Sequence, residues 1–189
     1  QEENPFLGWR GIRVSLDHPE IFIAQIRAMI RASEGIDCYL RIMLPMVSSI
    51  AEVDMARQLI DQCVREVEEE GVVFRRPDIG VMIEVPAAVY QAEALLKRVD
   101  FLSVGSNDLV QYMLAVDRNN AQVAGLYQEF HPAVLKALKQ VADAAIKAGK
   151  GVGICGEMAG NPGAALLLMA MGYQVLSMNS PNLLVVKKV

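Results

Sequence analysis

The chain has 189 residues, of which 53% are hydrophobic and 21% are charged, and its formal net charge is −4. A chain of this length and composition can bury the core of one domain. The negative charge, with no basic cluster larger than Arg75-Arg76 or Lys187-Lys188, argues against a nucleic-acid-binding protein.

The chain also lacks the marks of a membrane or exported protein. Its apolar runs are short and interrupted by charge, so we expect no membrane insertion. Residues 1–5 are polar and acidic and do not resemble a signal peptide. Three widely spaced cysteines, Cys38, Cys63 and Cys155, fit a reducing compartment such as the cytoplasm and argue against a disulfide framework or a zinc site.

Strand and helix patterns alternate along the chain. Pro19 opens the first helical stripe, Ser49 and Glu52 have capping-box spacing, and Gly149 is a helix stop signal. No helix is expected after the last strand. The predicted elements, in chain order, are a helix over 19–33, a strand over 40–46, a helix over 48–71, a strand over 79–86, a helix over 86–99, a strand over 101–108, a helix over 131–149, a strand over 152–155, a helix over 162–172 and a strand over 174–178.

Regular β–α alternation predicts an α/β fold with a parallel sheet covered by helices. Periodicity alone does not separate an open sheet from a barrel. The barrel is favoured because several strands end in polar residues, and in a (β/α)8 barrel all these ends converge on one mouth. A complete barrel takes about 250 residues. We therefore predict a truncated TIM-type (β/α)8 barrel of about five to six βα units, in one domain over residues 1–189.

Two of the predicted strands each end in an acid. Glu84 follows a run of apolar residues and glycine, and Asp108 closes the segment Gly105-Ser-Asn-Asp108. Two acids at the same edge of a sheet favour a Mg²⁺ site that takes its other ligands from water and a phosphorylated substrate. The alternative for Asp108 is a helix cap or a turn. That alternative is weaker for Glu84, because a buried lone acid must be solvated, paired or bound to metal.

Five motifs in one order identify a family resemblance. Together they resemble the C-terminal phosphoenolpyruvate-binding barrel of enzyme I of the bacterial sugar phosphotransferase system, and their wording is most similar to its nitrogen-related paralogue. Pyruvate phosphate dikinase and phosphoenolpyruvate synthase share this barrel, but the first motif is closer to enzyme I. The motifs are Glu3-Asn-Pro-Phe-Leu-Gly-Trp-Arg-Gly-Ile-Arg13, Gly80-Val-Met-Ile-Glu-Val-Pro-Ala-Ala88, Gly105-Ser-Asn-Asp-Leu-Val-Gln-Tyr112, Leu114-Ala-Val-Asp-Arg-Asn119 and Ile154-Cys-Gly-Glu-Met-Ala-Gly160.

The resemblance implies a phosphoryl transfer from phosphoenolpyruvate to a histidine on a separate N-terminal domain, which releases pyruvate and serves a phosphocarrier protein of the HPr type. Neither His18 nor His131 has the Gly-rich setting of that histidine, so we expect this chain to accept no phosphate itself. The phosphohistidine and regulatory domains are expected to lie outside this chain. A non-catalytic association module remains the alternative function class.

The resemblance also implies roles for individual residues. Phosphoenolpyruvate carries about three negative charges, which arginine forks and a cation can hold. Mg²⁺ can stabilise the enolate that forms, and a thiol can protonate it at neutral pH. The implied roles are Mg²⁺ ligands for Glu84 and Asp108 (with Mn²⁺ as an alternative ion), a substrate contact for Asn107 and Asp108, substrate clamps for Arg10 and Arg118, and proton donation to C3 of the enolate for Cys155.

Two of these roles have ordinary structural alternatives. Cys155 can be a small buried hydrophobe, as most free cysteines are. Arg10 can be a surface arginine stacked on Trp9. We also expect strand 40–46 to lie at an edge of the sheet, and we expect association into a homodimer or larger species, because an incomplete barrel exposes an edge and apolar core.

Overall fold

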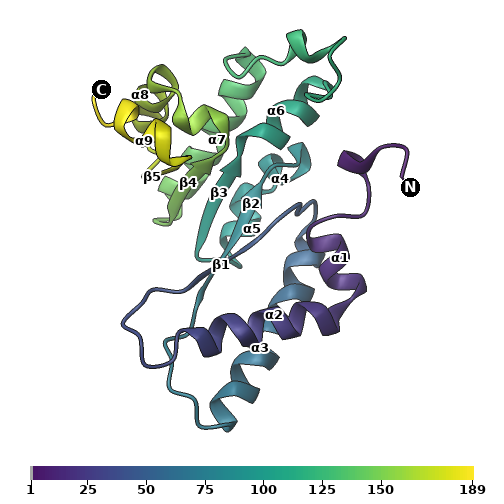
Figure 1. Ribbon diagram of the computed structural model, residues 1–189, viewed down its shortest axis with the longest axis vertical. Coiled ribbons are helices and arrows are strands. Elements are labelled where there is room, and N and C mark those ends of the chain that lie inside the picture. The colour runs from purple at the N-terminus through teal and green to yellow at the C-terminus, as the bar shows by residue number, and fades with distance from the viewer. Residues whose placement is uncertain (1) are drawn as a thin grey trace.

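A parallel sheet runs through the centre of the molecule (Figure 1). The computed structural model describes residues 2–189, so Gln1, the first residue of the polar N-terminal stretch, lies outside the described part. The sheet has five strands in the order β1-β2-β3-β4-β5. Each strand pairs in parallel with the next strand along the chain, as in the wall of a βα barrel. The strands are β1 (Arg41–Leu44), β2 (Asp78–Ile83), β3 (Phe101–Gly105), β4 (Gly151–Cys155) and β5 (Val175–Ser177).

Some of the helices begin at a residue whose side chain caps the first turn. Ser49 Oγ accepts from the Glu52 N–H, and the Glu52 carboxylate accepts from the Ser49 N–H, which confirms the capping box. His131 Nδ1 accepts from the Ala133 N–H at the start of α7. The α-helices are α1 (Ile12–Asp17), α2 (Pro19–Ala32), α3 (Ile50–Glu69), α4 (Pro86–Tyr90), α5 (Ala92–Leu96), α6 (Ser106–Leu114), α7 (Pro132–Lys147), α8 (Pro162–Met171) and α9 (Ser180–Val186), and the 3₁₀ helices are η1 (Pro5–Leu7), η2 (Ala124–Leu126) and η3 (Glu157–Gly160).

Several element predictions were wrong. The helix predicted over 86–99 is two short helices, α4 and α5, because Gln91 leaves the helical conformation between them. The strand predicted over 101–108 ends at Gly105, and the next residues form the first turn of α6. The prediction that no helix follows the last strand was also wrong. There α9 begins on an Asn179 cap, whose Oδ1 accepts from the Asn182 N–H.

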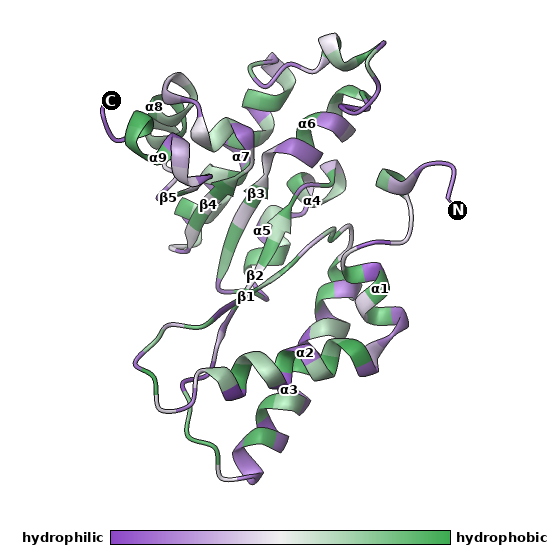
Figure 2. Ribbon diagram, in the orientation of Figure 1, coloured by the Kyte–Doolittle hydropathy of each residue, from purple (hydrophilic) through white to green (hydrophobic). Residues whose placement is uncertain are grey.

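The two faces of the sheet differ. Alternate residues of the strands are buried against helices on one face, and Figure 2 shows the hydrophobic colouring of these strands. The opposite face is open and holds a hollow of about 350 Å³, where the Arg41 guanidinium stacks on the Phe101 ring at 3.7 Å. In a closed barrel this face is the interior. The buried face consists of Ile42, Leu44, Ile79, Val81, Ile83, Leu102, Val104, Val152 and Ile154.

Strand β1 lies at one edge of the sheet, which confirms the prediction for strand 40–46. Among residues 2–189, none of the helices combines the length and the apolar character that a membrane span requires.

Truncating Leu102, in the central strand, should destabilise the fold strongly. Its side chain is 0% exposed, so we expect Leu102→Ala to lower the free energy of unfolding by about 2–5 kcal/mol, through lost burial and a residual cavity. Urea unfolding measures the change. Val73, which is 80% exposed, gives the matched control, and Val73→Ala should change the stability by less than about 0.5 kcal/mol.

Candidate metal and anion site

The carboxyl ends of three strands place the candidate residues at one level. Ile83 pairs with Val104, and Gly105 pairs with Cys155. Glu84 directly follows Ile83, so it lies beside Gly105 at the same edge as Cys155. A Cβ built on Gly105 would lie 2.8 Å from Glu84 Oε2. Because Gly105 has no Cβ, the Glu84 carboxylate can occupy this position.

Glu84 is a buried acid with a single backbone donor. Glu84 is 4% exposed, and its Oε1 accepts from the Met46 N–H at 2.5 Å. Met46 has a φ of 58°, a left-handed conformation that is rare for a residue with a side chain. Burial raises the pKa of Glu84 to about 7; the Met46 N–H opposes this rise, and the neighbouring Asp108 carboxylate adds to it.

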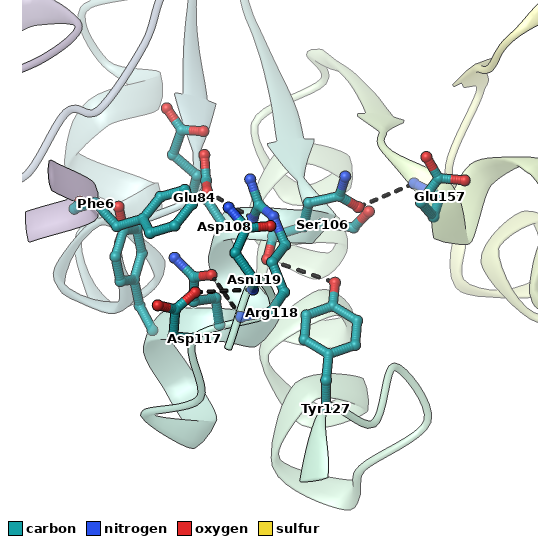
Figure 3. Close-up of polar contacts among 12 residues, drawn as sticks. Phe6, Glu84, Ser106, Asp108, Asp117, Arg118, Asn119, Tyr127 and Glu157 are labelled. Carbon is teal, nitrogen blue, oxygen red and sulfur yellow. Dashed lines mark hydrogen bonds and ion pairs between the residues drawn. The ribbon is translucent and has the colours of Figure 1, made fainter. Parts of the chain in front are cut away.

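Asp108 lies in the first turn of α6 and holds two arginines. Arg10 Nη2 lies 3.1 Å from Oδ2, and Arg118 Nη1 lies 2.8 Å from Oδ1. The residue is 8% exposed. Glu84 and Asp108 lie side by side in Figure 3. Because both Asp108 oxygens bind arginine, its side chain does not act as the helix cap that the sequence left open as an alternative.

Two further residues of α6 position the arginines, and neither role was predicted from the sequence. Tyr112 Oη lies 3.3 Å from Arg10 Nη1. Gln111 is 4% exposed, and its Oε1 accepts from the Arg118 backbone N–H at 3.1 Å. Their spacing of three and four residues from Asp108 places all three on one helical face. That spacing was the available signal, but it required recognising that a helix begins at Ser106.

Asn107 lies on the side of the Asp108 cluster (Glu84, Asp108, Arg10 and Arg118) that faces β4. Its Oδ1 accepts from the Glu157 N–H at 3.0 Å. Ser106 Oγ donates to the Cys155 carbonyl at 2.8 Å, which ties the start of α6 to the end of β4. The Asn107 amide oxygen is thus used inside the protein, and its NH₂ group is the part that suits an anionic ligand.

Cys155 is the last residue of β4 and is only partly buried. It lines a cavity of about 220 Å³ with Glu157, Ser177 and Asn179 among its other walls. Burial raises the pKa of the thiol, and the nearby Glu84 charge raises it further. The thiol therefore stays protonated at neutral pH, as a proton donor must. Its place on a cavity wall differs from that of Cys63, which is buried in the core.

The site thus brings together Glu84, Asp108, Arg10 and Arg118 and places Asn107 and Cys155 on its flank. Within residues 2–189, no group of three or more His, Cys, Asp or Glu side chains could hold a metal ion. Two neighbouring carboxylates remain. They fit Mg²⁺, which usually binds one or two protein carboxylates and completes its shell with water and phosphate oxygens.

Replacing Glu84 by glutamine should stabilise the metal-free protein at alkaline pH. The pKa of Glu84 is about 7 in the folded state and has its ordinary value of 4.5 in the unfolded state. Between pH 4.5 and about pH 7 the folded state therefore holds a proton that the unfolded state has lost, so the stability of the protein falls as the pH rises through this window. We expect Glu84→Gln to be more stable than the wild type by about 1–3 kcal/mol at pH 8 and equal to it near pH 4.5. Thermal unfolding in EDTA at both values measures this.

Glu34, which is exposed, supplies the control for that experiment. Glu34→Gln should change the stability equally at both pH values. A Glu84→Gln protein that is less stable than the wild type at pH 8 would show that the buried carboxylate is favourable there.

A parallel βα sheet whose strands are joined by helices defines an α/β protein of the TIM-barrel class, and here acids and arginines lie at the carboxyl edge of the sheet. A family model described as the PEP-binding domain of PEP-utilising enzymes matches residues 1–189. The chain belongs to this family.

Curated relatives agree with the family. The chain is 54% identical over 187 residues to a protein of Salmonella typhimurium named "Phosphoenolpyruvate-dependent phosphotransferase system", covering 98% of this chain and 25% of the relative. It is 46% identical over 189 residues to a phosphoenolpyruvate-protein phosphotransferase of Haemophilus influenzae, covering 100% of this chain and 32% of the relative. The chain therefore spans about a quarter to a third of the length of these relatives, and the predicted family resemblance is confirmed.

Solved structures confirm the fold class. A citrate lyase from Burkholderia xenovorans matches with a TM-score of 0.67 at 19% identity, over 90% of this chain and 54% of that chain. A malate synthase from Haloferax volcanii matches with a TM-score of 0.65 at 17% identity, over 90% of this chain and 51% of that chain. At such low identity these likenesses establish the fold alone, and the five described strands correspond to a partial barrel wall.

Proposed function

We propose that this chain is the phosphoenolpyruvate-binding part of a phosphoenolpyruvate-protein phosphotransferase of the enzyme I type. The observation that supports it is the Asp108 carboxylate, held by Arg10 and Arg118 beside the buried Glu84. The names of the relatives favour this enzyme over a dikinase or a synthase. In this proposal the accepting histidine belongs to a domain outside residues 1–189 and passes the phosphoryl group to a phosphocarrier of the HPr type.

In the proposed site, Glu84 and Asp108 hold Mg²⁺ or Mn²⁺. The ion, when bound, acts as a Lewis acid that stabilises negative charge on substrate oxygens. Arg10 and Arg118 bind the phosphate and carboxylate groups of phosphoenolpyruvate, which compete with Asp108 for the same guanidinium N–H groups. The Asn107 NH₂ group donates to the same ligand.

The transfer breaks the bond between phosphorus and the C2 oxygen of phosphoenolpyruvate. The oxygen keeps the electron pair, so pyruvate enolate is left in the site while the histidine takes the phosphoryl group. The Cys155 thiol then donates its proton to C3 of the enolate, which yields pyruvate and a thiolate that solvent reprotonates. The raised pKa of Cys155 supports this role, because it keeps the proton on the sulfur until the enolate forms.

The finer expectations belong to the same proposal. The three cysteines are free, which supports a cytoplasmic location. The amino-acid sequence of the motifs supports the nitrogen-related branch of enzyme I. Exposed apolar side chains on the last two helices, including Leu166, Met169 and Leu184, support association as a homodimer.

Calorimetry on the full-length protein tests the proposed function. We expect phosphoenolpyruvate to bind in the presence of Mg²⁺, and Arg118→Gln to weaken that binding about 10- to 100-fold, because a charge-assisted contact is lost. Arg98 pairs with Asp54 at 2.8 Å on the helical side of the sheet, so Arg98→Gln is the matched control and should bind normally. A wild-type protein that does not bind phosphoenolpyruvate would contradict the proposal.

A further inference from the structure

Both arginines that bind Asp108 also lie against one aromatic ring. The Cζ atom of Arg10 is 5.6 Å and that of Arg118 is 5.0 Å from the centroid of Phe6. Both distances fall within the range of about 6 Å in which a guanidinium is attracted to a ring face. Figure 3 shows Phe6 beside the Asp108 cluster. The ring is therefore a point of contact shared by the two cations of the site.

Phe6 is itself held in place by the site. The Tyr112 hydroxyl donates to the Phe6 carbonyl, and the same hydroxyl lies 3.3 Å from Arg10 Nη1. Arg13 Nη1 donates to the carbonyls of Leu7 at 2.9 Å and Gly8 at 2.8 Å. These bonds fix the short 3₁₀ helix η1, which has no buried residues of its own. Phe6 is only partly buried and is not part of the hydrophobic core, so its fixed position calls for another explanation.

The ring makes a kind of contact that a bound anion leaves intact. Asp108 and an anionic ligand both accept hydrogen bonds from the N–H groups at the edge of each guanidinium, so they compete for these groups. Phe6 offers the face of its ring and no oxygen acceptor, so it attracts each guanidinium without competing as an anion. When Arg10 and Arg118 exchange Asp108 for a ligand, the ring can keep both guanidinium groups in place. Arginines that are already oriented lose less conformational freedom when they bind.

We propose that Phe6 is a positioning residue that orients Arg10 and Arg118 for the phosphate and carboxylate groups of the substrate. This inference rests on the proposed function, and it adds an aromatic platform to the anion site. The aromatic face is the required property, so another aromatic ring replaces Phe6 and an aliphatic side chain of similar size does not.

Three variants of the full-length protein test this. We expect Phe6→Leu to weaken phosphoenolpyruvate binding about 5- to 30-fold in calorimetry with Mg²⁺. Its KM should rise by a similar factor, while kcat changes less than about threefold. Phe6→Trp should stay within about threefold of the wild type. Leu7 is 65% exposed in the same η1 helix, so Leu7→Ala is the matched control and should bind as the wild type does. Mg²⁺ alone should bind all of these variants with unchanged affinity.

The outcomes separate this inference from the proposed function. Equal binding by Phe6→Leu and the wild type, or equal losses in Phe6→Leu and Phe6→Trp, would overturn the positioning role while leaving the proposed function intact. If the wild type does not bind phosphoenolpyruvate, the proposed function fails. The contact is then tested by NMR: the Nε–Hε resonances of Arg10 and Arg118 should both move in Phe6→Leu, and unmoved resonances overturn the inference.

Discussion

Replacing Asp108 by asparagine should reduce phosphoenolpyruvate-dependent phosphorylation by the full-length protein at least about 100-fold, the largest loss we expect from any single charge removal in this chain. Asp108 contacts both Arg10 and Arg118 and is proposed to share a metal ion with Glu84. Asparagine keeps the size of the side chain but removes its charge. The variant should therefore lose affinity for Mn²⁺ and leave two arginines without their carboxylate.

The loss should come from the site rather than from unfolding. The Arg10 and Arg118 side chains are 33% and 29% exposed, so water can solvate them when asparagine replaces Asp108. The free energy of unfolding of the variant should therefore change by about 1 kcal/mol or less. Asp117 provides the control, because it is exposed and its Oδ1 accepts from the Asn119 N–H. Asp117→Asn should retain Mn²⁺ affinity. Normal Mn²⁺ affinity in Asp108→Asn, measured by calorimetry, would remove Asp108 from the metal site.

The sheet was predictable because each strand carries its own signal. All five predicted strands exist and pair in chain order, and Glu84 and Cys155 stand at strand ends as the apolar runs indicated. Parallel strands are buried on at least one face, so their apolar runs are continuous and easy to recognise. The same reasoning predicts Glu84 and Asp108 at one edge of the sheet.

Helix α6 was missed because its local sequence and its packing disagree. Gly105-Ser-Asn-Asp108 has the composition of a turn. The helix nonetheless begins at Ser106, because Leu109 and Val110, both 0% exposed, are buried in the core. Tertiary burial overrides weak local preference. For α9, by contrast, the signal was present: Asn179 and Pro181 form an ordinary helix start.

The contacts around Phe6 could not be predicted in the same way. The bond from Tyr112 to the Phe6 carbonyl joins residues 106 positions apart, and Arg10 meets Asp108 across 98 positions. No periodicity within a segment encodes such a pairing. Candidate residues at strand ends follow from local pattern, whereas the residues that orient them depend on how the N-terminal segment folds across α6.

Replacing Cys155 by alanine should slow pyruvate formation by the full-length protein about 10²- to 10⁴-fold, the range typical of a lost general acid. The thiol stands at the end of β4 on the wall of a cavity, and burial raises its pKa, so it holds its proton at neutral pH. Mg²⁺ and phosphoenolpyruvate should still bind, because the carboxylates and arginines are unchanged. Calorimetry and a pyruvate assay measure the two effects separately.

The pH dependence and a second cysteine make this expectation specific. A thiol with a raised pKa donates at neutral pH and loses this ability as the pH rises through that pKa, so the wild-type rate should fall on the alkaline side and the residual rate of Cys155→Ala should lack this step. Cys38 is exposed and far from the strand ends that form the site. Cys38→Ala should keep the full rate and the full pH profile. An undiminished rate in Cys155→Ala would assign the protonation of the enolate to another group.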